Sequence, residues 1–199
     1  SDADPDNSAL RGVELTCTDD SGSPTNTNSP KPLVQIQVVP VNTAPTVNLN
    51  GGPSGSNDVS KTFTEGQTGT TLITGNTGSA FASDPDSAQL SSCQIVITNI
   101  QNNGNEVLGT TFASGFFPFN GIPVSTQPQA VGSTTSSLTI TGLSSLANYN
   151  VVLGSIFYSN ADENPNTSVV RVIQTTCLDS ANLISNVANT RVTVVAVND

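Results

Sequence analysis

Residues 169–177 read VVRVIQTTC and residues 190–197 read TRVTVVAV, two runs in which β-branched residues alternate with polar ones. A period of two is typical of strands that bury one face and leave the other in water. Similar short runs recur along the chain, so the sequence predicts an all-β fold. The other predicted strands lie near residues 46–49, 61–65, 70–74, 92–100, 106–112, 136–141 and 155–158.

One segment departs from this alternation. Leu143, Leu146, Tyr149 and Leu153 recur at steps of three to four residues. This spacing predicts one or two short helical turns before the next strand. A loop pinned by three leucines and a tyrosine is the alternative interpretation.

The chain also repeats itself. The sequence TCTD at residues 16–19 returns as TCLD at residues 176–179, and the Val-Asn pair at 41–42 returns at 197–198. The cysteines lie 160 positions apart and the closing valines 156 apart, so one repeat spans roughly 156–160 residues.

This repeat predicts the domain organisation. Residues 1–43 are interpreted as the C-terminal half of one repeat, and residues 44–199 as a complete repeat that starts at the extended unit around Pro45. The half repeat should contain strands near residues 9–18 and 33–41. Its apolar face should be completed by upstream chain or by a neighbouring subunit.

Composition excludes several classes of function. The 199 residues carry a net charge of −10 with only five Lys and Arg, too few to neutralise a nucleic-acid backbone. No stretch approaches the roughly 20 apolar residues that a membrane span needs, and no signal peptide opens the chain, which is expected to be a mature or internal segment.

Catalysis is not expected. There is no His, so the commonest general base and the commonest transition-metal ligand are both missing. A carboxylate-based hydrolase acting on sugars would usually need an aromatic cleft, and the chain has no Trp and two Tyr.

Several blocks of sequence carry a family likeness. They are APTVNLNG (44–51), FTEG (63–66), SDPDSAQL (83–90), IVITN (95–99), LTITG (138–142) and VVAVND (194–199). In this order they resemble the successive blocks of bacterial cadherin-like tandem repeats, within the wider cadherin-like and immunoglobulin-like group. The resemblance implies a Greek-key β-sandwich used in long extracellular or cell-surface adhesins.

The resemblance also implies calcium at the joints between domains. Glu65, Asp84 and Asp86 would form the ligand set, with Asn42 offering its carbonyl. Thr43 stands where such repeats commonly have Asp, which is a departure from the pattern. The alternative is that the Asp-Pro-Asp sequence only makes a turn.

The three cysteines fit the repeat. Cys93 lies on an early predicted core strand and Cys177 on a late one, whereas Cys17 is the counterpart of Cys177 in the half repeat. We therefore predict a Cys93–Cys177 disulfide, which would stabilise the fold by about 4 kcal/mol in the chain-entropy model. Buried free thiols are the alternative, and the sequence names no partner for Cys17.

Sugars are possible modifications. Asn166 heads the only Asn-x-Ser/Thr sequence without a middle proline. Thr25, Thr27 and Ser29 lie in a Ser/Thr/Pro-biased segment typical of O-glycosylation. An unmodified flexible loop is the alternative in both places.

These observations favour a structural repeat of an extracellular filament or cell-surface adhesin, joined head to tail to identical subunits or adjacent repeats. Such joining would use continuous chain or strand donation. The alternative function is a carbohydrate- or protein-binding sandwich, with the Phe-rich stretch 112–119 as its contact surface.

Overall fold

The computed structural model describes residues 10–14, 33–51, 56–67, 71–75, 80–102, 104–111, 124–127 and 136–198, the side chains of 124–127 excepted. Two compact units make up the chain, Ser1–Asn42 and Thr43–Asp199. Within the described ranges, no helix has the length and apolar character needed to cross a membrane.

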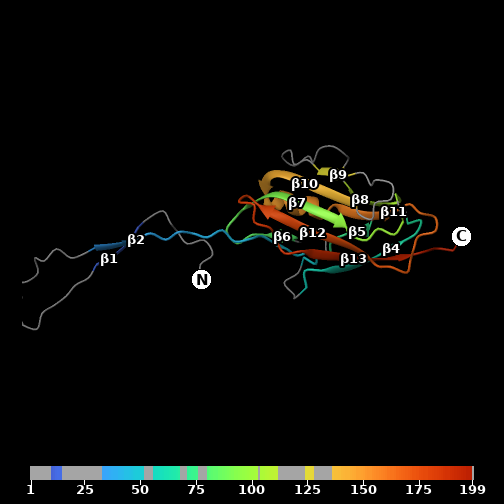
Figure 1. Cartoon of the computed structure of the whole chain (residues 1–199), viewed down its shortest axis with the longest axis horizontal. Coiled ribbons are helices and arrows are strands. Elements are labelled where there is room, and N and C mark those ends of the chain that lie inside the picture. Colours follow the sequence, from blue (N-terminus) through green and yellow to red (C-terminus); the bar gives the residue numbers. More distant parts are fainter. Residues whose placement is uncertain are drawn as a thin grey trace, which may run out of the picture. The chain divides into compact units, whose positions relative to one another are not determined.

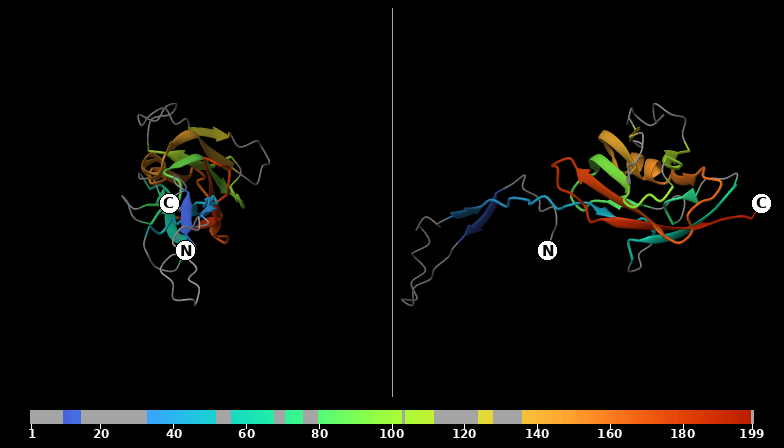
Figure 2. Two further views of the ribbon diagram at one scale, coloured as in Figure 1. Left: turned by 90° about the vertical axis from the view of Figure 1, so that its left-hand side faces the viewer. Right: turned by 45° about the vertical axis from the view of Figure 1, so that its right-hand side comes forward.

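A six-stranded sheet forms one layer of the second unit (Figure 1). Its strands lie in the order β4 (Val59–Thr64), β13 (Ala188–Val195), β12 (Arg171–Asp179), β7 (Gln89–Ile97), β10 (Ser136–Ser145) and β9 (Val124–Gln127). Neighbours are antiparallel except β4 and β13, which run parallel. Figure 2 shows β13, in red, running along the unit toward the C terminus.

The second layer is built from shorter elements. β5 (Thr71–Leu72), β11 (Ile156–Asn160) and β8 (Glu106–Thr110) form a three-stranded sheet, and β3 (Thr46–Val47) pairs with β6 (Ala82–Ser83). The helix α1 (Leu146–Leu153) packs against the same core through Tyr149, Val152 and Leu153.

A single apolar core lies between the layers. Phe63 of the first sheet meets Tyr158 of the second edge to face, with 5.4 Å between ring centroids. Along β12 every second residue is buried, as the alternation predicts. The prediction of an all-β sandwich is therefore confirmed. β6 and β9 lie outside every predicted strand.

A bulge explains how β10 passes into α1. The pairing of β10 with β7 shifts between Thr141 and Ser144, and Gly142 adopts a φ of 108°, a value that favours glycine. The Tyr149 hydroxyl donates to the Gly142 carbonyl at 2.6 Å. Ser145 caps the helix by accepting a hydrogen bond from the Asn148 amide. The short helical segment predicted from the leucine spacing is therefore present as one helix.

In the described part of the first unit, β1 (Arg11–Glu14) and β2 (Leu33–Ile36) form an antiparallel hairpin, drawn in blue in Figure 1. The strand predicted over 33–41 ends at Ile36, and residues 37–42 are not in a strand. Pro40 lacks the amide that a ladder needs, which helps to explain the early end. The remainder of the strand predicted over 9–18 falls largely outside the described residues.

Candidate functional site

A disulfide joins two central strands of the second unit. Cys93 on β7 and Cys177 on β12 are directly opposite each other, with 4.0 Å between their Cα atoms, and both are buried. The predicted pairing is thus present. Stable disulfides are typical of proteins that fold in oxidising compartments outside the cytosol. Cys17 lies outside the described residues.

The two carboxylates of the Asp-Pro-Asp sequence lie together in a turn after β6. Asp84 Oδ1 accepts hydrogen bonds from the amides of Asp86 and Ser87, at 3.1 and 2.9 Å. Asp86 Oδ2 accepts from the Thr43 amide at 2.7 Å. The Asp-Pro-Asp sequence therefore does form the turn that was the alternative to a calcium site.

The other oxygen of each carboxylate has no hydrogen-bond donor among the described residues. Asp84 Oδ2 and Asp86 Oδ1 are buried and accept no hydrogen bond from any of the described residues. Burial raises the pKa of Asp84. Burial also acts on Asp86, but the interaction with the neighbouring Asp84 carboxyl and the hydrogen bond from the Thr43 amide outweigh it and lower its pKa. Two buried carboxylate oxygens without donors among the described residues suit a hard cation.

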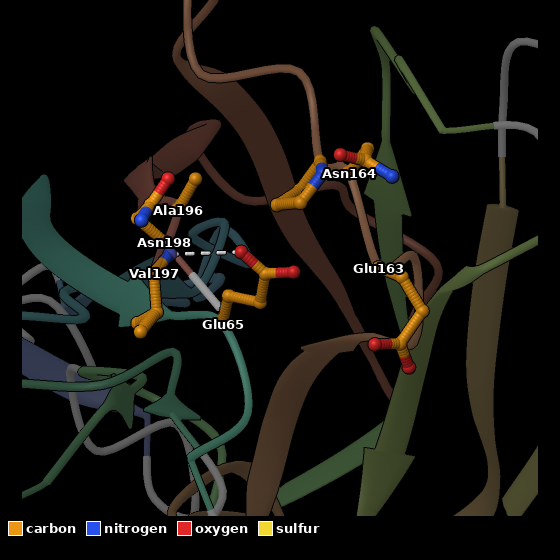
Figure 3. A pocket seen from close by; sticks show the side chains of 7 residues that line it. Glu65, Glu163, Asn164, Ala196, Val197 and Asn198 are labelled. Atoms are coloured by element: carbon orange, nitrogen blue, oxygen red, sulfur yellow. Dashed lines mark hydrogen bonds between the residues drawn. The ribbon is translucent and has the colours of Figure 1, made fainter.

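Glu65 directly follows β4 and bonds the segment that follows β13. Its Oε2 accepts the Val197 amide at 2.8 Å, and its own amide donates to the Val195 carbonyl at 2.8 Å. Its Oε1 is buried without a partner among the described residues. Figure 3 shows the Glu65 carboxylate beside Val197, with Glu163 across the pocket.

The structure does not group the predicted calcium ligands as one set. β4 carries Glu65 to residues 195–197, whereas Asp86 is bonded to Thr43. Asn42 is the last residue of the first unit. Nowhere in the described ranges do three or more His, Cys, Asp or Glu side chains come together as a metal site.

The carboxylate of Asp162, next to Glu163 in the sequence, accepts three hydrogen bonds from the protein. It accepts from the side-chain amides of Asn102 and Asn105 and from the Asn164 amide. The Asn164 hydrogen bond is the main reason why the pKa of Asp162 is lowered. This carboxylate therefore anchors the turn after β11 and has less capacity for a ligand.

The structure contains a buried ion pair that the sequence did not predict. Arg171 of β12 and Glu106 of β8 are both fully buried, and the guanidinium donates to Glu106 Oε1 at 2.7 Å. Arg171 also donates to the Asn102 side chain and to the carbonyls of Asn166 and Val169. Its position in the alternation, facing inward between apolar neighbours, is the signal that could have revealed it.

Of the proposed glycan sites, Asn166 lies among the described residues. Asn166 is half-buried, and its Nδ2 lies 3.4 Å from Gln101 Oε1, a contact that a glycan would have to displace. Its Oδ1 accepts from the amide and hydroxyl of Ser168. Thr25, Thr27, Ser29 and the Phe-rich stretch 112–119 lie outside the described residues.

Comparison with known proteins adds no relative: no family model matches the sequence, no curated protein matches it, and no solved structure matches the fold. Functional inference therefore depends on the chain's own residues.

Proposed function

We propose that this chain is a non-catalytic structural repeat of an extracellular filament or cell-surface adhesin, with Greek-key sandwiches of cadherin-like or immunoglobulin-like type joined head to tail. The observation that carries the proposal is a hairpin that occurs twice. Each of the four β1–β2 residue pairs becomes a β12–β13 pair when 160 is added to the β1 residue and 156 to the β2 residue. These are the offsets of the sequence repeat.

The path of the chain through the second unit supports end-to-end stacking. Thr43 enters beside the turn after β6, and Val197 leaves beside the end of β4. Figure 1 shows β6 toward one end of the unit and the C terminus at the other. A domain entered at one end and left at the other extends a filament with each repeat.

The location proposed for the protein can be tested on intact cells of its source. We expect immunogold antibodies raised against this chain to label filaments or the cell surface, because the disulfide suits an oxidising exterior. Labelling confined to the cell interior would contradict the proposal. Saturable binding on a glycan array would instead favour the alternative, a carbohydrate-binding module.

Calcium binding at Asp84 and Asp86 is part of the same proposal. The two buried oxygens without donors support it, and extracellular modules bind calcium with Kd of about 0.1–1 mM. Binding to the folded state alone would then add about 1–2 kcal/mol at roughly 5 mM calcium.

This proposal gives a prediction for thermal unfolding. Calcium at about 5 mM should raise the Tm by about 2–8 °C, and Asp84→Asn with Asp86→Asn should abolish the rise. Glu163→Gln, at an exposed carboxylate, is the matched control and should keep it. The rise should shrink as the pH falls, because the raised pKa of Asp84 lets protons compete with calcium. A Tm indifferent to calcium and to chelator removes the site.

A further inference from the structure

The β1–β2 hairpin has a twin in this chain, and the twin shows what such a hairpin packs against. β12 and β13 lie between β7 and β4: β12 pairs antiparallel with β7, and β13 pairs parallel with β4. The described part of the first unit contains β1 and β2 alone, as a two-stranded sheet. An isolated two-stranded hairpin is at best marginally stable in water.

The exposed residues of the hairpin match buried positions of its twin. Val13, Val34 and Ile36 are 44%, 47% and 47% exposed. The repeat aligns them with Ile173, Thr190 and Val192, each of which is 0% exposed. Three apolar side chains on one face are therefore about half exposed at positions where the twin buries its side chains completely.

Charge on this face narrows the choice of partner. Arg11 occupies the position of Arg171, whose guanidinium is buried against Glu106 and Asn102. Burial of an arginine is tolerable only with a carboxylate and further acceptors around it. A sheet of the same repeat type would supply such a carboxylate at the place of Glu106.

We infer that the β1–β2 hairpin docks into a second β-sandwich of this same repeat type, between a strand like β7 and a parallel strand like β4, with Arg11 paired to a buried glutamate like Glu106. The inference depends on the proposed head-to-tail function and names its partner. Recognition combines two strand edges, an apolar face and one buried ion pair. A flat apolar surface without a carboxylate would not be a partner of this kind.

The partner surface exists within this chain, so an exchange of hairpins tests the inference. Residues 170–197 of the full chain are replaced by a copy of residues 10–41, with the original Cys17 changed to Ser. We expect cooperative unfolding and a disulfide between Cys93 and the grafted Cys17 on peptide mapping. Amides of the grafted Val13, Val34 and Ile36 should exchange about 100-fold more slowly than those in the unmodified first unit.

A matched control shifts the graft by one residue, with a single Ser inserted before Arg11 and another before Leu33. This slip turns the apolar face to solvent and the polar face to the core, so that chain should lose cooperative unfolding and amide protection. Equal protection in the shifted and unshifted grafts would overturn the inference.

Arg11 has its own test within the graft. Arg11→Met should lower the folding equilibrium constant by about 100-fold or more, and adding Glu106→Met should restore most of it. A structural role unconnected with Glu106 would give no such rescue, and that result would overturn the ion-pair part of the inference.

The connection between β1 and β2 is longer than that between β12 and β13, and it could itself prevent the graft from folding. A smaller graft avoids this connection. It transfers only the paired residues, through V172G, I173V, Q174E, N189L, T190V, R191Q and V192I in the full chain. Failure of both grafts would overturn the inference. Surface labelling of filaments would be unaffected by such a failure, so the proposed function would stand or fall separately.

Discussion

Arg171→Ala should lower the free energy of unfolding by about 3–5 kcal/mol, because it leaves the Glu106 carboxylate buried without its cation. That loss is a large part of the roughly 5–15 kcal/mol that stabilises a typical domain. Three further acceptor groups around the guanidinium would also lose a donor. Tyr158 is also fully buried, and this burial, with the Glu106 charge second, raises its pKa above the usual range.

Urea denaturation followed by circular dichroism measures the effect. Arg191→Ala is the matched control, since Arg191 is exposed on β13, and it should change stability by no more than about 0.5 kcal/mol. The double change Arg171→Met with Glu106→Met should recover much of the loss, because apolar replacements of a buried pair are often neutral. Equal losses for Arg171→Ala and Arg191→Ala would contradict the importance of the pair.

Removal of the disulfide by Cys93→Ala with Cys177→Ala should lower the free energy of unfolding by about 4 kcal/mol. The bond closes a loop between residues 84 positions apart, so without it the unfolded chain gains conformational freedom. The cysteines are also a cross-strand pair in the sheet, so their loss removes a contact between β7 and β12.

The measurement is the urea midpoint of the oxidised protein against that of the double variant. Cys17→Ala is the control, because Cys17 takes no part in this disulfide, and it should leave the difference intact. A reducing agent should move the parent protein toward the variant. An unchanged midpoint after confirmed reduction would show that the bond contributes nothing to stability.

The sequence was sufficient for the features that depend on local pattern. Alternation revealed β12 and β13, because each buries every second residue against one core. The repeat revealed the Cys93–Cys177 pair, since it separated Cys17 as a counterpart of Cys177. β6 and β9 were not predicted: β6 is two residues long, and β9 has a single aliphatic residue, Val124.

Features that depend on which strands become neighbours could not be predicted in the same way. Arg171 and Glu106 are 65 positions apart, and they meet only because β8 and β12 lie in facing layers. Glu65 and Asp86 were grouped by resemblance, but β4 places Glu65 beside Val197, while Thr43 holds Asp86. Spacing along a chain does not reveal which end of a sandwich a side chain occupies.

The parallel pairing of β4 and β13 has a mechanical consequence. Six residue pairs join them, from Val59 and Thr190 to Thr64 and Val195. A pull that draws Thr43 and Val197 apart along the strands loads this ladder in shear, so its hydrogen bonds share the force. An antiparallel pair pulled from one end would instead unzip bond by bond. The second unit is therefore built to resist tension along the direction in which its chain enters and leaves.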